Sequence, residues 1–156
     1  MKRFFANVVF AAAIIALSAA ARADYVAPHI EHGDYGALKI VAPLTSADPK
    51  LWAMKLRNAQ NAIDIAKAWR GTLDLRFVLW AQGVHLLDSP TDDVKAKIDA
   101  LRAAGVKFEI CANTLRENNI DFHTLYGVSE ADLVPAGFLE VPYLEQREGF
   151  AVAPVN

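Results

Sequence analysis

The residue whose type and position best suit chemistry is Cys111, the only cysteine in the chain. It ends a predicted strand over residues 106–111, directly before a turn in which Asn113 and Thr114 can cap a short helix. The partial positive charge of a helix N-terminus favours the thiolate, the form of cysteine that attacks sulfur or carbon. A free cysteine also packs as a small buried hydrophobe, so the residues alone leave both interpretations open.

The histidines are the next candidates. His85 lies in the loop after the second predicted strand, from which its ring could approach Cys111 and stabilise a thiolate; a surface role is the alternative. Nearer the N-terminus, His29, His32 and Asp34 could gather around a divalent metal ion. An HxxH pair in an irregular segment arises often by chance, so we interpret these as solvated loop residues and keep the metal site as the alternative.

The sequence also excludes several kinds of site. A single cysteine rules out an intrachain disulfide and a zinc site of the multi-cysteine kind. The patterns GxGxxG, GxxxxGK[ST] and GxSxG are absent, and we predict no cofactor. The formal net charge is −2, and without the first 23 residues 13 Lys and Arg face 18 Asp and Glu. An acidic balance of this kind argues against nucleic-acid binding, which needs a basic face.

The first 23 residues are predicted to be a secretory signal peptide. A short positive start precedes an apolar run over residues 4–17, and Ala21-Arg22-Ala23 is a small-x-small cleavage site. Cleavage would leave Asp24 as the N-terminus and place the mature protein in the periplasm, with no membrane contact. An uncleaved N-terminal anchor is the alternative. Lipid anchoring at the cleavage site is excluded because it requires a cysteine there.

The elements that must position Cys111 alternate between strand and helix after an extended lead-in over residues 24–36. Asp48 and Pro49 are typical of an N-cap and the first helical position. We predict one domain over residues 37–156, with strands at 38–42, 73–81, 106–111, 133–136 and 150–153, and helices at 49–70, 89–105, 113–118 and 137–148. This order indicates an α/β fold, a three-layer α/β/α sandwich around a mostly parallel sheet of about five strands, flavodoxin-like in appearance.

Two local features of this prediction bear on the site. In the third strand Val106, Phe108 and Ile110 alternate with Lys107, Glu109 and Cys111, which predicts one apolar face, with Cys111 on the other. In the last helix, Pro142 must produce a kink or mark the start. Loops and helix N-termini meet beyond the carboxyl ends of parallel strands, so we expect the chemistry at that edge of the sheet.

Four stretches resemble the DsrE/DsrF-like family. They are TSADPKLWAMKLRNAQNA over residues 45–62, FVLWAQGVHLL over 77–87, GVKFEICANTL over 105–115 and EGFAVAP over 148–154. The first contains the Asp-Pro, tryptophan and Arg-Asn-x-x-Asn pattern of the family's opening unit. The second has Trp80 and Ala81 where many members have a histidine and a glycine. The match covers most of residues 38–154 through the order and spacing of its parts.

The resemblance implies a parallel α/β fold that assembles into trimers or hexamers. In the family's sulfur relays, a cysteine after the third strand carries a persulfide between partner proteins, and Cys111 occupies that position. One hypothesis is therefore an exported sulfur carrier or sulfurtransferase-type relay, homo-oligomeric, with a thiol or sulfur-carrier protein as partner. The alternative is a non-enzymatic oligomeric binding or structural module in which Cys111 is only packed.

Overall fold

The computed structural model describes residues 25–153, so the predicted signal peptide lies outside the described residues. The chain divides into two units, residues 1–30 and 31–156. The described part of the first unit is exposed and, like residues 31–36 of the second, contains no helix or strand. Within the described residues, none of the helices has the length and apolar character needed to span a bilayer.

Strands and helices alternate through the second unit. The strands are β1 (Ala37–Leu44), β2 (Thr72–Leu79), β3 (Lys107–Cys111), β4 (Leu133–Val134) and β5 (Ala151–Val152). The α-helices are α1 (Pro49–Ala68), α2 (Asp92–Ala103), α3 (Ala112–Glu117) and α4 (Gly137–Glu148), and the 3₁₀ helices are η1 (Ala81–Leu87), η2 (Phe122–Thr124) and η3 (Glu130–Asp132).

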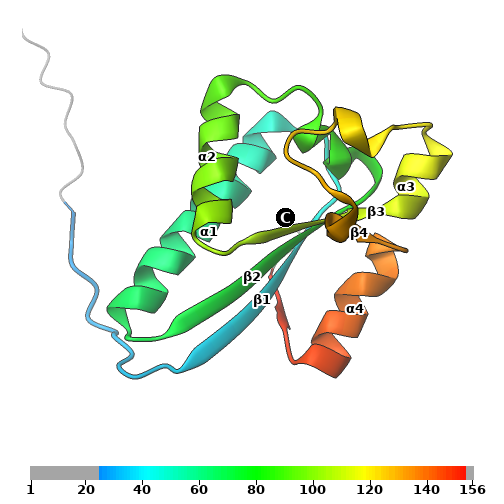
Figure 1. Cartoon of the computed structure of the whole chain (residues 1–156). Coiled ribbons are helices and arrows are strands. Elements are labelled where there is room, and N and C mark those ends of the chain that lie inside the picture. The colour runs from blue at the N-terminus through cyan, green and yellow to red at the C-terminus, as the bar shows by residue number, and fades with distance from the viewer. Residues whose placement is uncertain (1–24, 154–156) are drawn as a thin grey trace, which may run out of the picture. The chain divides into compact units, whose positions relative to one another are not determined.

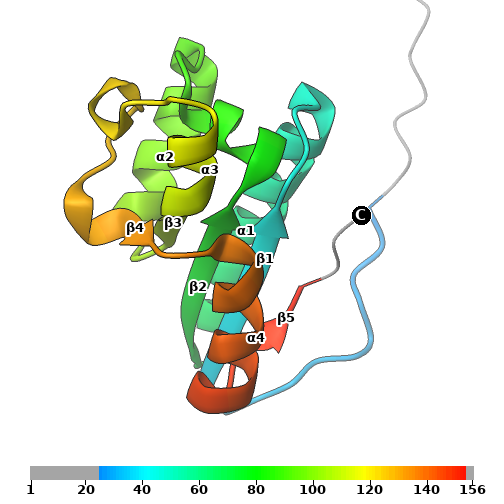
Figure 2. The same cartoon turned by 90° about the vertical axis from the view of Figure 1, so that its right-hand side faces the viewer.

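The five strands form one parallel sheet in the order β4-β3-β2-β1-β5. Figures 1 and 2 show α1 and α2 on one side of this sheet and α4 on the other. The α/β fold and the parallel five-stranded sheet predicted from the sequence are confirmed. In the register, Phe77 at the centre of β2 pairs with Ala42 on β1 and Phe108 on β3.

The face beneath α1 and α2 carries the main core. Phe77 and Phe108 stack with ring centroids 5.2 Å apart, and each is about 1% exposed. The helices contribute the stripes expected from their three- and four-residue spacing. These buried helix residues are Leu56, Ala59, Ile63 and Ala66 on α1, and Ile98 and Leu101 on α2.

The opposite face is covered by α4, and here the structure corrects the sequence prediction. Val41, Val78, Leu144 and Phe150 form a second, smaller core on this side. Because α4 lies over the sheet, β3 is buried on both faces, and its polar side is not solvated as the alternation suggested. Glu109 in particular is only 9% exposed.

Some helices start where the sequence predicts, and others start elsewhere. Asp48 caps α1 by accepting a hydrogen bond from Lys50 N–H at 2.9 Å, as predicted. The helix predicted at 89–105 begins later than expected, because Thr91 is the N-cap of α2. The helix after β3 begins at Ala112, so Cys111 itself is the N-cap and the predicted capping at Asn113 is wrong. Pro142 lies inside α4 rather than at its start.

Gly83 in η1 lies directly against the end of β1. Its N–H donates to Trp80 C=O at 3.0 Å. A Cβ at this position would overlap the carbonyl oxygen of Leu44, which is backbone and cannot rotate away.

We therefore expect Gly83→Ala to lower the free energy of unfolding by about 2–4 kcal/mol, because η1 must move off β1. Denaturant unfolding of the folded protein measures this change. Gln82→Ala, at the exposed neighbouring position, is the matched control and should change it by less than about 0.5 kcal/mol. Equal stability of the two variants would contradict the close approach.

Candidate functional site

Cys111 occupies the junction between β3 and α3, at the carboxyl edge of the sheet. It is the last residue of β3 and the N-cap of α3, and it is 5% exposed. The placement at a strand end before a helix is the one expected from the sequence. The burial shows that the thiol is part of the packed structure as well.

The surroundings of the sulfur favour its ionised form. Burial alone raises the pKa of the Cys111 thiol, but N–H groups of Gly137, Thr114 and Asn113 and the Thr114 hydroxyl interact with the sulfur and together hold its pKa below the usual value. The two helical N–H groups face the sulfur without the geometry of a direct cap hydrogen bond. The lowered pKa therefore depends on several weak donors acting together.

Thr114 is oriented by a second contact. Its Oγ1 accepts a hydrogen bond from the N–H of Ala81 at 3.0 Å, at the start of η1. Because the oxygen already acts as an acceptor there, the hydroxyl proton is free to point to the sulfur of Cys111. Thr114 is buried, so this arrangement is shielded from water. The loop after β2 thus orients the Thr114 hydroxyl, which interacts with the sulfur of Cys111 at the end of β3.

Gly137 brings the N-terminus of α4 against the thiol. A Cβ on Gly137 would lie 3.2 Å from the Cβ of Cys111 and 3.1 Å from the Cβ of Trp80. Only a residue without a side chain allows this approach without displacing a neighbour, and the approach is what places the Gly137 N–H on the sulfur. Gly137 was not among the predicted site residues; the available signal was a glycine that opens a predicted helix.

The predicted thiolate partner His85 lies in η1 and is partly exposed. Its Nδ1 is 3.6 Å from Oδ2 of Asp88. Among the described residues, the donors that lower the pKa of Cys111 come from Asn113, Thr114 and Gly137. The structure thus pairs His85 with a carboxylate, and its role toward Cys111 stays a prediction.

Two of the three residues of the alternative metal site, Asp34 and His32, make contacts with other residues. Within residues 25–153 no group of three or more His, Cys, Asp or Glu side chains lies close enough to hold a metal ion. Asp34 accepts a hydrogen bond from Nε of Arg70 at 2.7 Å. The ring of His32 lies edge-on to those of Trp69 and Tyr35, with centroids 4.9 and 5.7 Å apart.

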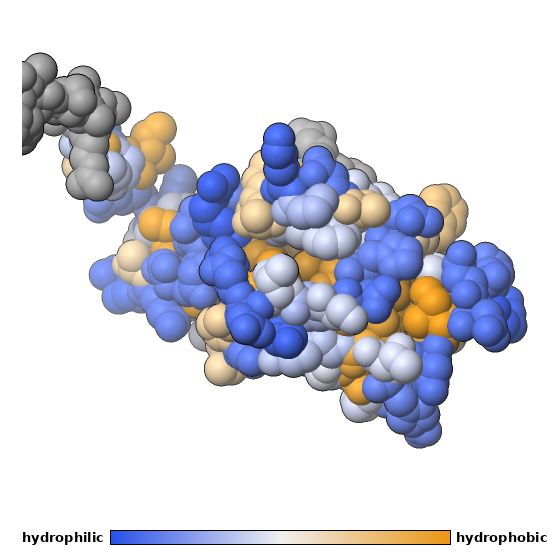
Figure 3. Space-filling model, turned by 90° about the horizontal axis from the view of Figure 1, so that it is seen from above, coloured by the Kyte–Doolittle hydropathy of each residue, from blue (hydrophilic) through white to orange (hydrophobic). Residues whose placement is uncertain are grey.

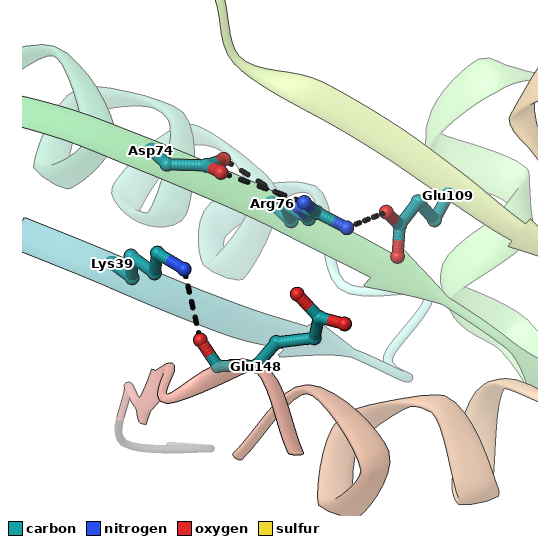
Figure 4. Close-up of polar contacts among 5 residues, drawn as sticks. All are labelled: Lys39, Asp74, Arg76, Glu109 and Glu148. Carbon is teal, nitrogen blue, oxygen red and sulfur yellow. Dashed lines mark hydrogen bonds and ion pairs between the residues drawn. The ribbon is translucent and has the colours of Figure 1, made fainter.

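A partly buried ion-pair network, not foreseen from the sequence, lies on the Cys111 face of the sheet. Figure 4 shows Arg76 between Asp74 and Glu109, with Nη1 of Arg76 3.2 Å from Oε1 of Glu109 and Nη2 3.5 Å from Oδ2 of Asp74. Oε2 of Glu109 is buried without a hydrogen-bond partner in the described structure. Burial raises the pKa of the Glu109 carboxyl above its usual range, against the opposing effect of Arg76.

Exposed apolar side chains follow Gly137 along α4. Phe138, Leu139 and Tyr143 are 79%, 67% and 51% exposed. The face seen from above in Figure 3 also has scattered apolar residues exposed between hydrophilic ones. Side chains of this size and exposure are typical of surfaces that contact another protein.

Comparisons with solved structures identify the fold. The protein of unknown function MTH1491 from Methanobacterium thermoautotrophicum is 22% identical, with a TM-score of 0.64 over 74% of this chain and 97% of that chain. The chain has the fold of that protein. The conserved protein of unknown function BT1422 from Bacteroides thetaiotaomicron is 19% identical, with a TM-score of 0.52 over 73% and 91% of the two chains. The ychN protein from E. coli is 16% identical, with a TM-score of 0.50 over 74% and 96%.

These likenesses establish the fold and leave the activity open. No family model matches the chain, and no curated protein matches it in sequence. At 16–22% identity, the three solved structures show a shared fold only.

Replacing Thr114 by valine removes one donor from the sulfur of Cys111 at nearly constant volume. We expect the pKa of the thiol to rise and alkylation at pH 7 to slow by about three- to tenfold, with rates converging at alkaline pH where both thiols are ionised. The pH profile of reaction with iodoacetamide measures this shift. Thr91→Val, at an exposed position, is the control. An unshifted profile in T114V would show that the hydroxyl does not act on the sulfur.

Replacing Arg76 by methionine leaves the Glu109 carboxylate buried without its cation. We expect a loss of about 3 kcal/mol in the free energy of unfolding at pH 7. The loss should shrink as the pH falls through the raised folded-state pKa of Glu109, because the protonated carboxyl is neutral. Thermal and denaturant unfolding between pH 5 and pH 8 test this, with Arg147→Met on the exposed side of α4 as control. A pH-independent loss would refute the electrostatic explanation.

Proposed function

We propose that this chain is an exported DsrE-like protein that carries sulfane sulfur on Cys111. The observation that carries the proposal is the set of donors from Asn113, Thr114 and Gly137 that lower the pKa of the thiol. A relay cysteine reacts as the thiolate and must also be a good leaving group. A lowered pKa increases the thiolate fraction and makes the thiolate a better leaving group. The sequence resemblance, which aligns Cys111 with the family's persulfide cysteine, supports the same function.

The reaction needs only sulfur exchange. The Cys111 thiolate attacks the outer sulfur of a persulfide donor R–S–SH, the donor S–S bond breaks, and RS⁻ leaves as Cys111–S–SH forms. An acceptor thiolate then attacks the outer sulfur of that persulfide, and Cys111 leaves as the thiolate. No net oxidation or reduction occurs, since one S–S bond is formed for each one broken. The donors around the sulfur stabilise the Cys111 thiolate before the first step and after the second.

Access to the thiol sets the geometry of transfer. With Cys111 only 5% exposed, a donor reaches the sulfur when the N-terminal turn of α4 moves aside. The exposed side chains of Phe138 and Leu139 follow directly after Gly137, so a partner that binds them acts on the turn that covers the thiol. We propose this surface as the contact for a thiol or sulfur-carrier partner protein.

Export and assembly complete the proposal. The signal-like residues 1–23 would direct the chain to the periplasm, where the sulfur donor and acceptor must then also be found. We propose a homo-oligomer, a trimer or hexamer, as the family resemblance implies. Closed cyclic symmetry is the usual way for such a small domain to assemble.

A second candidate function is supported by the burial of the thiol. In a non-enzymatic oligomeric binding module, Cys111 acts as a small core residue between Trp80 and Gly137. The N–H and hydroxyl donors then serve only as hydrogen-bond partners of the buried sulfur. This candidate predicts a thiol that stays inert in the folded protein.

Incubation of the folded protein with a sulfane donor such as polysulfide distinguishes the two functions. The carrier should gain about 32 Da, the mass of one sulfur atom, and lose it on reduction or on addition of an acceptor thiol. Cys111→Ser is the control, since a hydroxyl forms no persulfide. Wild-type protein that gains no mass when folded, yet is alkylated at Cys111 after denaturant is added, would overturn the carrier and leave the binding module.

A further inference from the structure

The outer side of α4 carries an exposed face next to the turn that covers the thiol. Tyr143 lies one helical turn after both Leu139 and Glu140, so the three side chains share one side of the helix. Gly137 and Leu144, two turns apart, are buried and mark the side that faces the sheet. Figure 2 shows α4 in front of the sheet, with no helix or strand of the described residues over its outer side. We call Leu139, Glu140 and Tyr143 the outer face of α4.

A small pocket of about 200 Å³ opens on the outer face of α4. Leu139 and Tyr143 line it on the helix, and Pro135 and Ala136 line it just before the helix starts. Among the described residues of the lining, Glu140 is the one with a charged side chain. Sites for small organic ligands usually have volumes of at least about 300 Å³, so this pocket is better matched to a single apolar side chain of another protein.

The carboxylate of Glu140 is paired with no cation in the part of the chain that the structure describes. Arg76, on the same side of the sheet, is already engaged by Asp74 and Glu109. Burial raises the pKa of the Glu109 carboxyl, and the negative charge of Glu140 adds to this rise. Arg76 and Lys107 oppose it. Glu140 and Glu109 therefore lie close enough to repel each other, and a positive charge brought to Glu140 is attracted by both carboxylates.

α4 itself is acidic, with three Glu and one Arg among its 12 residues. An apolar surface with an acidic rim is complementary to a partner that presents an apolar side chain next to a basic one. We propose that the thiol-bearing partner docks on the outer face of α4, with an apolar side chain in the pocket and a lysine or arginine paired with Glu140. This inference rests on the function proposed above, because it describes the protein that exchanges sulfur with Cys111.

The position of Glu140 also limits the sequence of the partner. Glu140 is three residues after Gly137, whose N–H acts on the sulfur of Cys111, and this spacing is about 4.5 Å along the helix axis. An extended chain advances by about 3.3 Å per residue, so one partner segment can place a cation at Glu140 and a thiol at Cys111. The basic residue and the reacting cysteine of the partner should therefore lie within about two to four residues of each other.

Other partners match the outer face of α4 less well. An acidic partner is repelled by Glu140 and Glu109. A purely apolar partner covers Leu139 and Tyr143 but buries the Glu140 carboxylate without a cation, which costs free energy. A second copy docked through the same face brings two Glu140 carboxylates together around the symmetry axis. The apolar and acidic parts together therefore select a basic, amphipathic segment of a different protein.

Disulfide exchange with short peptides tests the charge of the partner. The probes are Ac-Leu-Lys-Ala-Cys-amide and Ac-Leu-Glu-Ala-Cys-amide, each with its cysteine in a mixed disulfide with thionitrobenzoate. The Cys111 thiolate attacks the peptide sulfur, a new S–S bond forms, and the coloured thionitrobenzoate leaves as a thiolate, so absorbance gives the rate. Each rate is divided by the rate of the same peptide with mercaptoethanol, which removes differences in intrinsic reactivity.

We expect the lysine peptide to react at least about fivefold faster than the glutamate peptide at low ionic strength, with a ratio that falls as salt is added. Glu140→Gln should abolish this preference. Glu145→Gln, exposed on the same helix, changes the net charge of the protein equally and should leave the ratio unchanged. Equal ratios in the wild type and E140Q, or the same loss in E145Q, would overturn the proposal.

Leu139→Ala tests the apolar contact. It should slow both peptides alike, by about threefold or more, without changing the ratio between them. Ile65→Ala, which removes an exposed apolar side chain from α1, is the matched control and should change neither rate. Dissociation of an oligomer by L139A, with unchanged peptide rates, would assign the outer face of α4 to a second copy of the chain and overturn the proposal.

Sulfur loading from polysulfide, measured as mass gain on the same protein, separates this inference from the function on which it rests. Loading without a Glu140-dependent preference for the lysine peptide supports the carrier and overturns the partner. A Glu140-dependent preference without any mass gain supports the docking surface and overturns the carrier. A folded protein whose thiol neither gains sulfur nor reacts with either peptide overturns both.

Discussion

The close approach of the α4 N-terminus to the end of β3 is the constraint on which the candidate site depends. With no side chain at Gly137, the backbone reaches Cys111 and Trp80, closes the second face of the sheet and directs an N–H at the sulfur. The same approach buries β3 on both sides. The absence of a Cβ at Gly137 therefore contributes to both the shielding and the electrostatics of the thiol.

Much of the fold could be predicted from the sequence because it is specified locally. Apolar periodicity located five strands, the Asp48-Pro49 pair located the start of α1, and α4 was placed within its observed bounds. These signals depend on neighbours along the chain. The parallel sheet followed from the alternation of strand and helix.

The parts that could not be predicted depend on contacts between distant segments. Glu109 is polar and alternates with apolar residues, so the sequence predicts a solvated side chain. In the structure, α4, which follows some 30 residues later in the chain, covers it. The sequence predicts that Thr114 caps a helix. In the structure its hydroxyl is oriented by the N–H of Ala81, in the loop after β2. Cys111 was found because residue type and strand end coincide in the sequence itself, whereas its donors come partly from elsewhere in the chain.

The order of strands has a consequence for how the protein is made. β1, the first strand of the described residues, occupies an inner position in the sheet, with β2 on one side and β5 on the other. Its outer edge therefore has no strand partner until Ala151 and Val152 have left the ribosome. Long-range pairing of this kind slows folding, and an open strand edge invites contact with other chains. Until β5 is made, the growing chain keeps an open edge on β1, the state in which a binding chaperone can hold it.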